Sequence, residues 1–333
     1  MSAIGEFRSK VAGIGSYLPE KVLTNFDLEK MVDTNNQWIV ERTGIERRHL
    51  ASESEATSDL AYQAAIKALA MANMDAKDLD MIIVATVSPD QMMPSTACVL
   101  QNKLGCKNIF SFDLTAACSG FVYALSVADQ FIRTGMYKNV LVVGGEVLHR
   151  FVNYKDRETC ILFGDGAGAW ILSRTNKEDA NIIFSSHLHA DGSLGDLFVL
   201  PAGGSKIPFT EAVLKAESQY VKMKGREIFK NAVRTLTDCC HEALNANEVS
   251  ASQVDWLVPH QANLRILESV ADYFKFPKEK VVVSLHETGN TSAASIPVAF
   301  DLAYQQGKIK RGQLILLAAF GAGLTSGSIL LRF

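Results

Sequence analysis

The chain repeats one order of strands and helices, and this duplication is the strongest constraint on its fold. The apolar runs of the first half, and the helix-like segment among them, are MIIVATVS (81–88), NIFSFDL (108–114), a helical pattern to about Arg133, and NVLVVGG (139–145). Those of the second half are DWLVPHQ (255–261), a helical pattern over 263–274, VVVSL (281–285), a helical pattern over 291–305, and QLILLAAFG (313–321). One offset of roughly 175 positions superposes both series, which is typical of a duplicated domain.

Apolar runs that alternate with helical patterns indicate βαβ units and a largely buried parallel sheet. Two such halves side by side predict an α/β fold with layers in the order helix, sheet, helix, sheet, helix. The polar stretch SRTNKEDAN, near residues 174–182, breaks the apolar pattern. We therefore expect an N-terminal half over residues 1–178 and a C-terminal half over residues 179–333.

Charge and hydrophobicity exclude several classes of protein. Of the 333 residues, 48% are hydrophobic and the net charge is -3, so the chain has no general attraction to nucleic acid or an anionic membrane. No apolar run reaches the ~18 residues of a membrane span, and the N-terminus MSAIGEFRSK lacks the apolar core of a signal peptide. The six cysteines form no C-x-x-C pair, which favours reduced thiols over disulfides or a metal site. We expect a cytoplasmic protein without nucleic-acid or membrane partners.

Cys118 lies in DLTAACSGFVYAL, between a predicted strand and a predicted helix. The free N–H groups at a helix N-terminus favour an anion, so the thiol is expected to be more acidic than its usual pKa of about 8.5. A thiolate is a nucleophile. Taken alone, however, a cysteine between small residues is more often a buried core residue.

Two further polar residues occupy equivalent positions after strands. His260 follows a strand in VPHQANLRI, and Asn290 lies in the turn of HETGNTSAASIP. Chemistry in such sheets lies at the carboxyl ends of strands, and the duplication superposes the Cys118 segment near the Asn290 segment. We therefore expect Cys118, His260 and Asn290 to converge on one pocket, where two neutral donors could hold the oxygen of an enolate.

Other interpretations of these motifs are weaker. Papain-like proteases also use Cys, His and Asn in that order, but their nucleophile lies in C-G-[SA]-C-[WY], whereas this chain has AACSGF. The glycine-rich stretches GDGAGAW (164–170) and FGAGLTSG (320–327) do not match a nucleotide-binding fingerprint. Tight strand turns, or N–H groups presented to an oxyanion, explain these glycines better.

The motifs TAACSGF, VPHQANLRI, GNTSAAS, FGDGAGA and FGAGLTSGSILLRF closely resemble those of β-ketoacyl-acyl-carrier-protein synthase III. The likeness runs from about Lys10 to Phe333, in family order. It implies a thiolase-like fold of five αβαβα layers, a homodimer, and an acyltransferase without a bound cofactor that initiates fatty acid biosynthesis.

The resemblance also implies a role for each catalytic position. Cys118 would take an acyl group from acyl-CoA, and its backbone N–H with that of Ala322 would form the oxyanion hole. His260 and Asn290 would stabilise the enolate produced when malonyl-acyl-carrier-protein loses carbon dioxide. This carbanion would attack acyl-Cys118 in a Claisen condensation.

The binding residues come from the same resemblance. Those implied for coenzyme A and its pantetheine arm are Trp38, Arg42, Arg157, Gly225, Phe229, Ala262 and Asn263. Lys230, Gln261 and Arg265 would contact the acyl carrier protein, although Asp272 and Tyr273 stand where some relatives have lysine. Met93 would reach across the dimer to the floor of the acyl pocket. Its flexibility predicts that acyl groups somewhat longer than acetyl are accepted as well as acetyl.

Competing functions share parts of this pattern. A related ketosynthase of secondary metabolism would use another acyl partner, and a hydroxymethylglutaryl-CoA synthase fits the motifs less well. A cysteine-dependent hydrolase would pass the acyl group to water. A catalytically inactive relative is disfavoured because Cys118, His260 and Asn290 are all present.

Overall fold

The computed structural model describes residues 6–333. Residues 1–5, the first half of the segment MSAIGEFRSK in which no signal peptide is predicted, lie outside it. The strands are β1 (Phe7–Tyr17), β2 (Lys21–Thr24), β3 (Arg47–Leu50), β4 (Met81–Ala85), β5 (Phe110–Leu114), β6 (Asn139–Glu146), β7 (Gly166–Asn176), β8 (Ile183–Ala190), β9 (Phe198–Val199), β10 (Lys222–Met223), β11 (Trp256–Pro259), β12 (Leu314–Gly321) and β13 (Thr325–Arg332). The helices are α1 (Asn25–Leu28), α2 (Asn36–Thr43), α3 (Thr57–Ala72), α4 (Thr96–Lys103), α5 (Gly120–Arg133), α6 (Glu211–Lys215), α7 (Gly225–Ala246), α8 (Leu264–Tyr273), α9 (Leu285–Thr288) and α10 (Ser295–Gln305).

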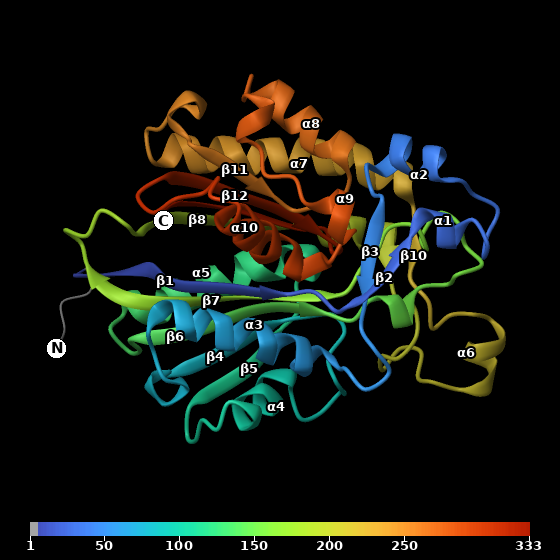
Figure 1. Ribbon diagram of the computed structural model, residues 1–333, viewed down its shortest axis with the longest axis horizontal. Coiled ribbons are helices and arrows are strands. Elements are labelled where there is room, and N and C mark those ends of the chain that lie inside the picture. Colours follow the sequence, from blue (N-terminus) through green and yellow to red (C-terminus); the bar gives the residue numbers. More distant parts are fainter. Residues whose placement is uncertain (1–5) are drawn as a thin grey trace.

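Two mixed sheets form the centre of the molecule (Figure 1). One has the strand order β1-β7-β6-β4-β5 and the other β11-β12-β13-β8. Strand β4 is parallel to β5 and β6, and β11 is parallel to β12, whereas the remaining pairs within these two sheets are antiparallel. The prediction of a parallel sheet is therefore wrong, because both sheets are mixed. One reason is that β13 follows β12 through a tight turn, and a turn that short can join only antiparallel strands.

The sheets and helices stack in five layers, as predicted. Helices α5 and α10 lie between the sheets, α3 and α4 cover the outer face of the first sheet, and α7 and α8 cover the outer face of the second (Figure 1). Alternate side chains of β4 explain this: Met81 and Ile83 pack in the central core, whereas Ile82 and Val84 pack beneath α3 and α4. The predicted α/β fold is confirmed.

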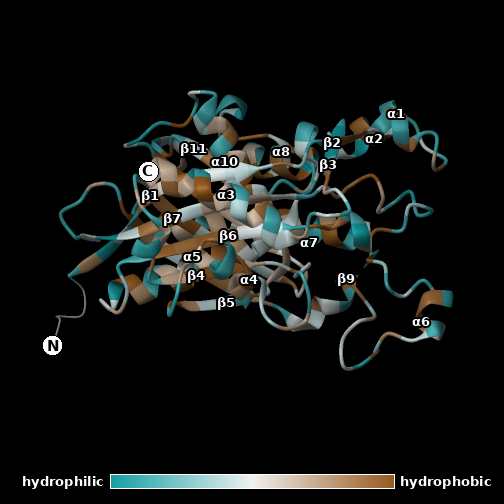
Figure 2. Ribbon diagram, turned by 60° about the horizontal axis from the view of Figure 1, so that its bottom comes forward, coloured by the Kyte–Doolittle hydropathy of each residue, from teal (hydrophilic) through white to brown (hydrophobic). Residues whose placement is uncertain are grey.

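The central core belongs to both halves of the chain. It joins side chains from both sheets and from α5 and α10, and Figure 2 shows apolar residues concentrated on these inner elements. The predicted boundary falls in the connection between β7 and β8, and the division at residues 178 and 179 stays a prediction. No helix in residues 6–333 has the length and hydrophobicity needed to span a bilayer.

The predicted strand over 281–285 is not formed. Val281 makes only an isolated parallel bridge to Leu257, and Leu285 already begins α9. The side chain of Gln261 takes the place of a strand partner here. Its Nε2 donates to the Val282 carbonyl at 3.1 Å, and its Oε1 accepts from the Ser284 N–H at 2.9 Å. These bonds use backbone groups that a regular ladder would need.

Two equivalent turns precede the central helices. The 3₁₀ turn η2 (Ala117–Ser119) leads into α5, and the 3₁₀ turn η7 (Ser292–Ala294) leads into α10. The first residue of each has a left-handed backbone, with φ of 47° at Ala117 and 48° at Ser292. Such a conformation is uncommon outside glycine and concentrates at functional sites. The duplicated halves thus bring two strained corners together at the centre of the molecule.

Candidate active site

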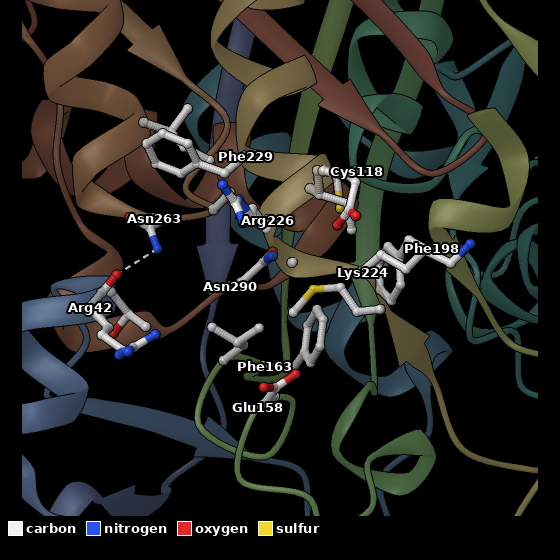
Figure 3. A pocket seen from close by; sticks show the side chains of 18 of the residues that line it. Arg42, Cys118, Glu158, Phe163, Phe198, Lys224, Arg226, Phe229, Asn263 and Asn290 are labelled. Carbon is white, nitrogen blue, oxygen red and sulfur yellow. Dashed lines mark hydrogen bonds between the residues drawn. The ribbon is translucent and has the colours of Figure 1, made fainter.

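A cavity of about 780 Å³ reaches the centre of the molecule, and Cys118, His260 and Asn290 all line it. Cys118 belongs to η2 of the first half, His260 follows β11, and Asn290 lies between α9 and η7. Figure 3 shows Cys118 and Asn290 with other side chains of this cavity. The convergence predicted from the duplication is therefore present.

Cys118 is only 6% exposed, and this burial determines its acidity. The pKa of the thiol is raised to about 12, mainly by burial; the Ser292 side chain opposes this rise and the Glu146 carboxylate adds to it. The prediction of an acidic thiol is therefore wrong. The N-terminus of α5 lies beside the sulfur, but the cost of removing a thiolate from water is larger than this stabilisation.

His260 is 1% exposed, and burial lowers the pKa of its imidazole to about 3, so the ring is neutral. Its Nδ1 lies 2.6 Å from the Ser295 Oγ. That oxygen also accepts from the Gln261 N–H at 3.4 Å. When the Ser295 hydroxyl donates to Nδ1, Nε2 carries the ring proton and is the nitrogen free to act as a neutral donor.

Asn290 is held by its backbone and by its own side chain. Its N–H donates to the Leu162 carbonyl at 2.8 Å, and its carbonyl accepts from the Gly164 N–H at 3.1 Å. Its Oδ1 accepts from the Ser292 N–H at 2.8 Å. Because the oxygen is engaged, the Nδ2 group is the part of this amide that can donate to a ligand.

Ala322 lines the same cavity, beside a very close approach of two backbone segments. A Cβ atom built on Gly321 would lie 2.7 Å from the Cys118 nitrogen and 3.0 Å from the Ser119 nitrogen. Only glycine lets the 321–322 segment lie this close to η2. The oxyanion hole predicted at Cys118 and Ala322 stays a prediction.

Gly321→Ala is expected to slow acylation of Cys118 at least about 100-fold, because the new methyl group displaces η2 from the 321–322 segment. Intact-mass measurement of the acyl adduct over time would give this rate. Gly204→Ala is the matched control, since a Cβ there meets nothing within 4 Å. Acylation of Gly321→Ala at the wild-type rate would contradict the importance of this approach.

The residues predicted to bind coenzyme A form one wall of the cavity. The guanidinium carbons of Arg42 and Arg157 lie 4.7 Å and 5.1 Å from the centroid of the Trp38 ring. Asn263 caps α8 and donates from Nδ2 to the Arg42 carbonyl at 2.8 Å (Figure 3). All seven of these predicted residues line the cavity, namely Trp38, Arg42, Arg157, Gly225, Phe229, Ala262 and Asn263.

The predicted carrier-protein residues divide into two groups. Arg265 is exposed, lines the cavity and lies with its guanidinium carbon 5.3 Å from the Phe229 ring centroid, and Lys230 is exposed nearby on α7. Gln261, in contrast, is fully buried. The prediction that Gln261 contacts a partner is wrong, because its amide is engaged with the 282–284 backbone.

Sequence reasoning missed two basic residues at the cavity. Lys224 and Arg226 flank the start of α7, are exposed and line the cavity (Figure 3). Five basic side chains line it against two carboxylates, those of Glu158 and Glu227. The signal was present in the segment KMKGREIFK, where four basic residues cluster around the predicted Gly225. The cavity therefore favours an anionic ligand.

A second cavity, of about 120 Å³, meets the first at Cys118, Phe163, Phe198 and Ala322. No charged residue lines it, and most of its wall is apolar: Val87, Leu148, Phe151, Val152, Phe163, Phe198, Val199, Leu200 and Val221. Met93 lines neither cavity and is 81% exposed. Its predicted contact with an acyl group requires a partner subunit and stays a prediction.

Three buried polar residues close to the site were also missed. Ser295 orients His260. Ser292 and Glu146, which ends β6, both influence the pKa of Cys118. The sequence signals were the acid that ends the apolar run NVLVVGGE and the serines of GNTSAAS. Within residues 6–333, no cluster of three or more His, Cys, Asp or Glu side chains is arranged to hold a metal ion.

A buried cysteine, a neutral histidine and an asparagine at the junction of two related halves define the class as a ketosynthase with the thiolase-like fold. Residues 112–192 match the family described as 3-oxoacyl-[acyl-carrier-protein (ACP)] synthase III, and residues 244–333 match its C-terminal part. The chain is 50% identical over 323 residues to beta-ketoacyl-[acyl-carrier-protein] synthase III of Caldanaerobacter subterraneus subsp. tengcongensis, covering 97% of both. It therefore belongs to the β-ketoacyl-acyl-carrier-protein synthase III family.

Solved structures agree with this membership. The 3-oxoacyl-[acyl-carrier-protein] synthase III of Aquifex aeolicus superposes with a TM-score of 0.90 at 48% identity, over 98% of this chain and 100% of that one. The priming β-ketosynthase of the R1128 polyketide pathway superposes with a TM-score of 0.91 at 30% identity, over 100% of this chain and 98% of that one.

Proposed function

We propose that this enzyme joins an acyl group from acyl-CoA to malonyl-acyl-carrier-protein by decarboxylative Claisen condensation, the first condensation of fatty acid biosynthesis. The observation that carries the proposal is the shared cavity of Cys118, His260 and Asn290. Cys118 attacks the acyl-CoA thioester, and the backbone N–H groups of Cys118 and Ala322 stabilise the oxyanion. Coenzyme A then leaves, and the acyl group stays on sulfur.

His260 and Asn290 act in the second half of the reaction. The neutral Nε2–H and the Nδ2 group donate to the thioester oxygen of the malonyl group. Loss of carbon dioxide then produces an enolate at that oxygen, and its carbon attacks the carbonyl of acyl-Cys118. Neutral donors suit this step because no proton has to be removed from carbon.

The same cavity receives both thioesters. Trp38, with the guanidinium groups of Arg42 and Arg157 beside its ring, suits an adenine and its phosphates. Gly225, Phe229, Ala262 and Asn263 line the same cavity and would contact the pantetheine arm. The exposed Lys224, Arg226, Lys230 and Arg265 provide a basic surface for the acidic carrier protein.

The second cavity is the proposed site of the acyl chain. Its apolar wall begins at Cys118 and extends to β9 and to Val221 before β10. An acetyl group needs little of this space, so acyl groups longer than acetyl gain burial there. This supports a primer range that includes acetyl and somewhat longer chains.

Val221→Phe is expected to reduce acylation by hexanoyl-CoA at least about tenfold while acylation by acetyl-CoA changes little, because the added ring fills the far part of the cavity. Rates with both substrates would be measured on the same preparation, which makes acetyl-CoA the internal control. Equal losses with both substrates would mean that the chain lies elsewhere.

We also propose a cytoplasmic homodimer. β5 is an edge strand of its sheet, and Phe110 on it is 44% exposed. Met92 and Met93, at 82% and 81% exposure, add apolar surface before α4. A second copy would cover such surface. The six free cysteines support a reducing compartment.

The function is tested by intact mass in two stages. Incubation with acetyl-CoA is expected to give one acetyl adduct on Cys118, located by peptide mapping, and malonyl-acyl-carrier-protein is then expected to convert it to ketoacyl product. An adduct that is lost only to water would favour a hydrolase. An adduct that reacts with another extender thioester but not with malonyl-acyl-carrier-protein would favour a ketosynthase of secondary metabolism.

A further inference from the structure

Glu146 is a buried carboxylate next to the nucleophile, and the reaction described above does not use it. It is the last residue of β6 and is 0% exposed. Within residues 6–333 it forms no ion pair. A buried charge without a cation is costly, so its presence beside Cys118 requires a reason.

The hydrogen bonds of Glu146 leave one of its oxygens lightly used. Oε2 accepts from the Ser88 hydroxyl at 2.6 Å, from the Thr86 hydroxyl and Val87 N–H at 3.1 Å, and from the Ser88 N–H at 3.2 Å. In the described part of the chain, Oε1 accepts one longer bond, of 3.3 Å, from the Val87 N–H. Oε1 is therefore the better position for a proton.

Ser292 lies near both this carboxylate and the sulfur of Cys118. It lines the small apolar cavity together with Cys118, and its side chain lowers the pKa of both the Cys118 thiol and the Glu146 carboxyl. The turn η7 that carries it packs against both η2 and β6. Gly144 permits this packing, since a Cβ there would lie 2.2 Å from the Ala293 carbonyl oxygen. Ser292 itself has a left-handed backbone, with φ of 48°.

We propose that Glu146, acting through the Ser292 hydroxyl, accepts the proton of Cys118 during acylation and returns it when the condensation product leaves. This rests on the proposed role of Cys118 as the acylated residue. As the sulfur bonds to the thioester carbon, the S–H proton passes to the Ser292 oxygen and the Ser292 proton passes to Glu146. Coenzyme A leaves as a thiolate and takes a proton from water.

The second half of the cycle reverses this transfer. When the carbanion attacks acyl-Cys118, the carbon–sulfur bond breaks and the Cys118 thiolate is released. Glu146 then returns its proton through Ser292 to the sulfur. The solvent proton taken up by coenzyme A equals the one proton that decarboxylative condensation consumes, so atoms and charges balance.

The acidities of the three candidate groups support this assignment. With the pKa of Cys118 near 12, the thiol needs a base to react at neutral pH. His260 cannot hold the proton, because burial lowers the pKa of its imidazole to about 3. Burial raises the pKa of Glu146 to about 7, which suits a group that takes and returns a proton near neutrality. The ionisable group that faces Glu146 across Ser292 is Cys118, and its other partners are hydroxyl and amide groups.

The test uses the rate of acylation by acetyl-CoA, followed by quenched intact mass on the whole enzyme. Glu146→Gln and Ser292→Ala are each expected to lower this rate about 100-fold at pH 7. Charge alone predicts the opposite for Glu146→Gln, because removing an anion lowers the pKa of the neighbouring thiol and speeds its attack. An unchanged or faster rate in Glu146→Gln would overturn the proposal.

The pH profile separates proton transfer from a structural role. In the wild type, acylation is expected to rise as Glu146 loses its proton near pH 7 and then to level off. Glu146→Gln is expected to lose this step and to rise only at higher pH, with the thiolate fraction. If Glu146→Gln or Ser292→Ala still showed the wild-type rise of the acylation rate near pH 7, the relay would be contradicted.

A matched control lies next to Ser292. Thr291 is buried and its hydroxyl has no hydrogen-bond partner within residues 6–333. Thr291→Val, which removes a hydroxyl from the same turn, should therefore acylate at the wild-type rate. If the wild type acylates a residue other than Cys118, the proposed function fails; if Cys118 is acylated equally in all variants, only the relay fails. If Glu146→Gln does not fold, Ser292→Ala against Thr291→Val still decides.

Discussion

Replacing Cys118 by alanine is expected to remove both the acyl adduct and the condensation activity, a loss of at least about 10⁴-fold. The reason is chemical: within residues 6–333, Cys118 is the one cysteine that lines the large cavity, so no other thiol can take its place there. The measurement is the two-stage mass experiment, with product formation followed by a coupled assay for released coenzyme A.

Cys98→Ala provides the control for this prediction. Cys98 is a free, half-buried cysteine on α4 that lines neither cavity, so its replacement should leave both stages intact. An adduct that persists in Cys118→Ala, or that disappears in Cys98→Ala, would mean that the nucleophile has been wrongly assigned.

His260→Ala is expected to separate the two half-reactions. Decarboxylation of the malonyl thioester should fall about 10²- to 10³-fold, because one donor to the developing enolate is lost. Acylation of Cys118 should stay close to the wild-type rate, since the neutral imidazole is not its base. Carbon dioxide release from labelled malonyl-acyl-carrier-protein and the mass assay measure the two steps independently.

The control for this variant is His241→Ala, because His241 is exposed on α7 and bonds Tyr273 rather than the cavity. Both half-reactions should proceed normally in it. A His260→Ala enzyme that decarboxylates normally but fails to acylate would reverse the assigned role and would also contradict the relay through Glu146.

Much of the fold could be predicted because its signals are local or periodic. The duplication, the buried apolar runs and the residues after each strand are visible in the sequence, and together they place Cys118, His260 and Asn290 in one pocket. The direction of β13 depends on a tight turn, and the loss of the strand over 281–285 depends on one buried glutamine, Gln261. Neither effect has a periodic signature.

The electrostatics of the site could not be predicted for a related reason. The N-terminus of α5 indicates a more acidic thiol, but the depth of Cys118 in the folded chain determines the opposite direction. Ser292 comes close to the end of β6, where Glu146 lies, because Gly144 allows η7 to pack closely on β6. Such long-range packing is set by the whole structure, and a single motif does not report it.

Cys118 lies where the long cavity and the small apolar cavity meet, and this has a kinetic consequence. In the proposed reaction the acyl chain occupies the small cavity, so the long cavity must serve both the departing coenzyme A and the arriving carrier-protein arm. The two thioesters therefore exclude each other. We expect parallel lines in double-reciprocal plots, and each substrate at high concentration should inhibit by occupying the passage when the other is needed.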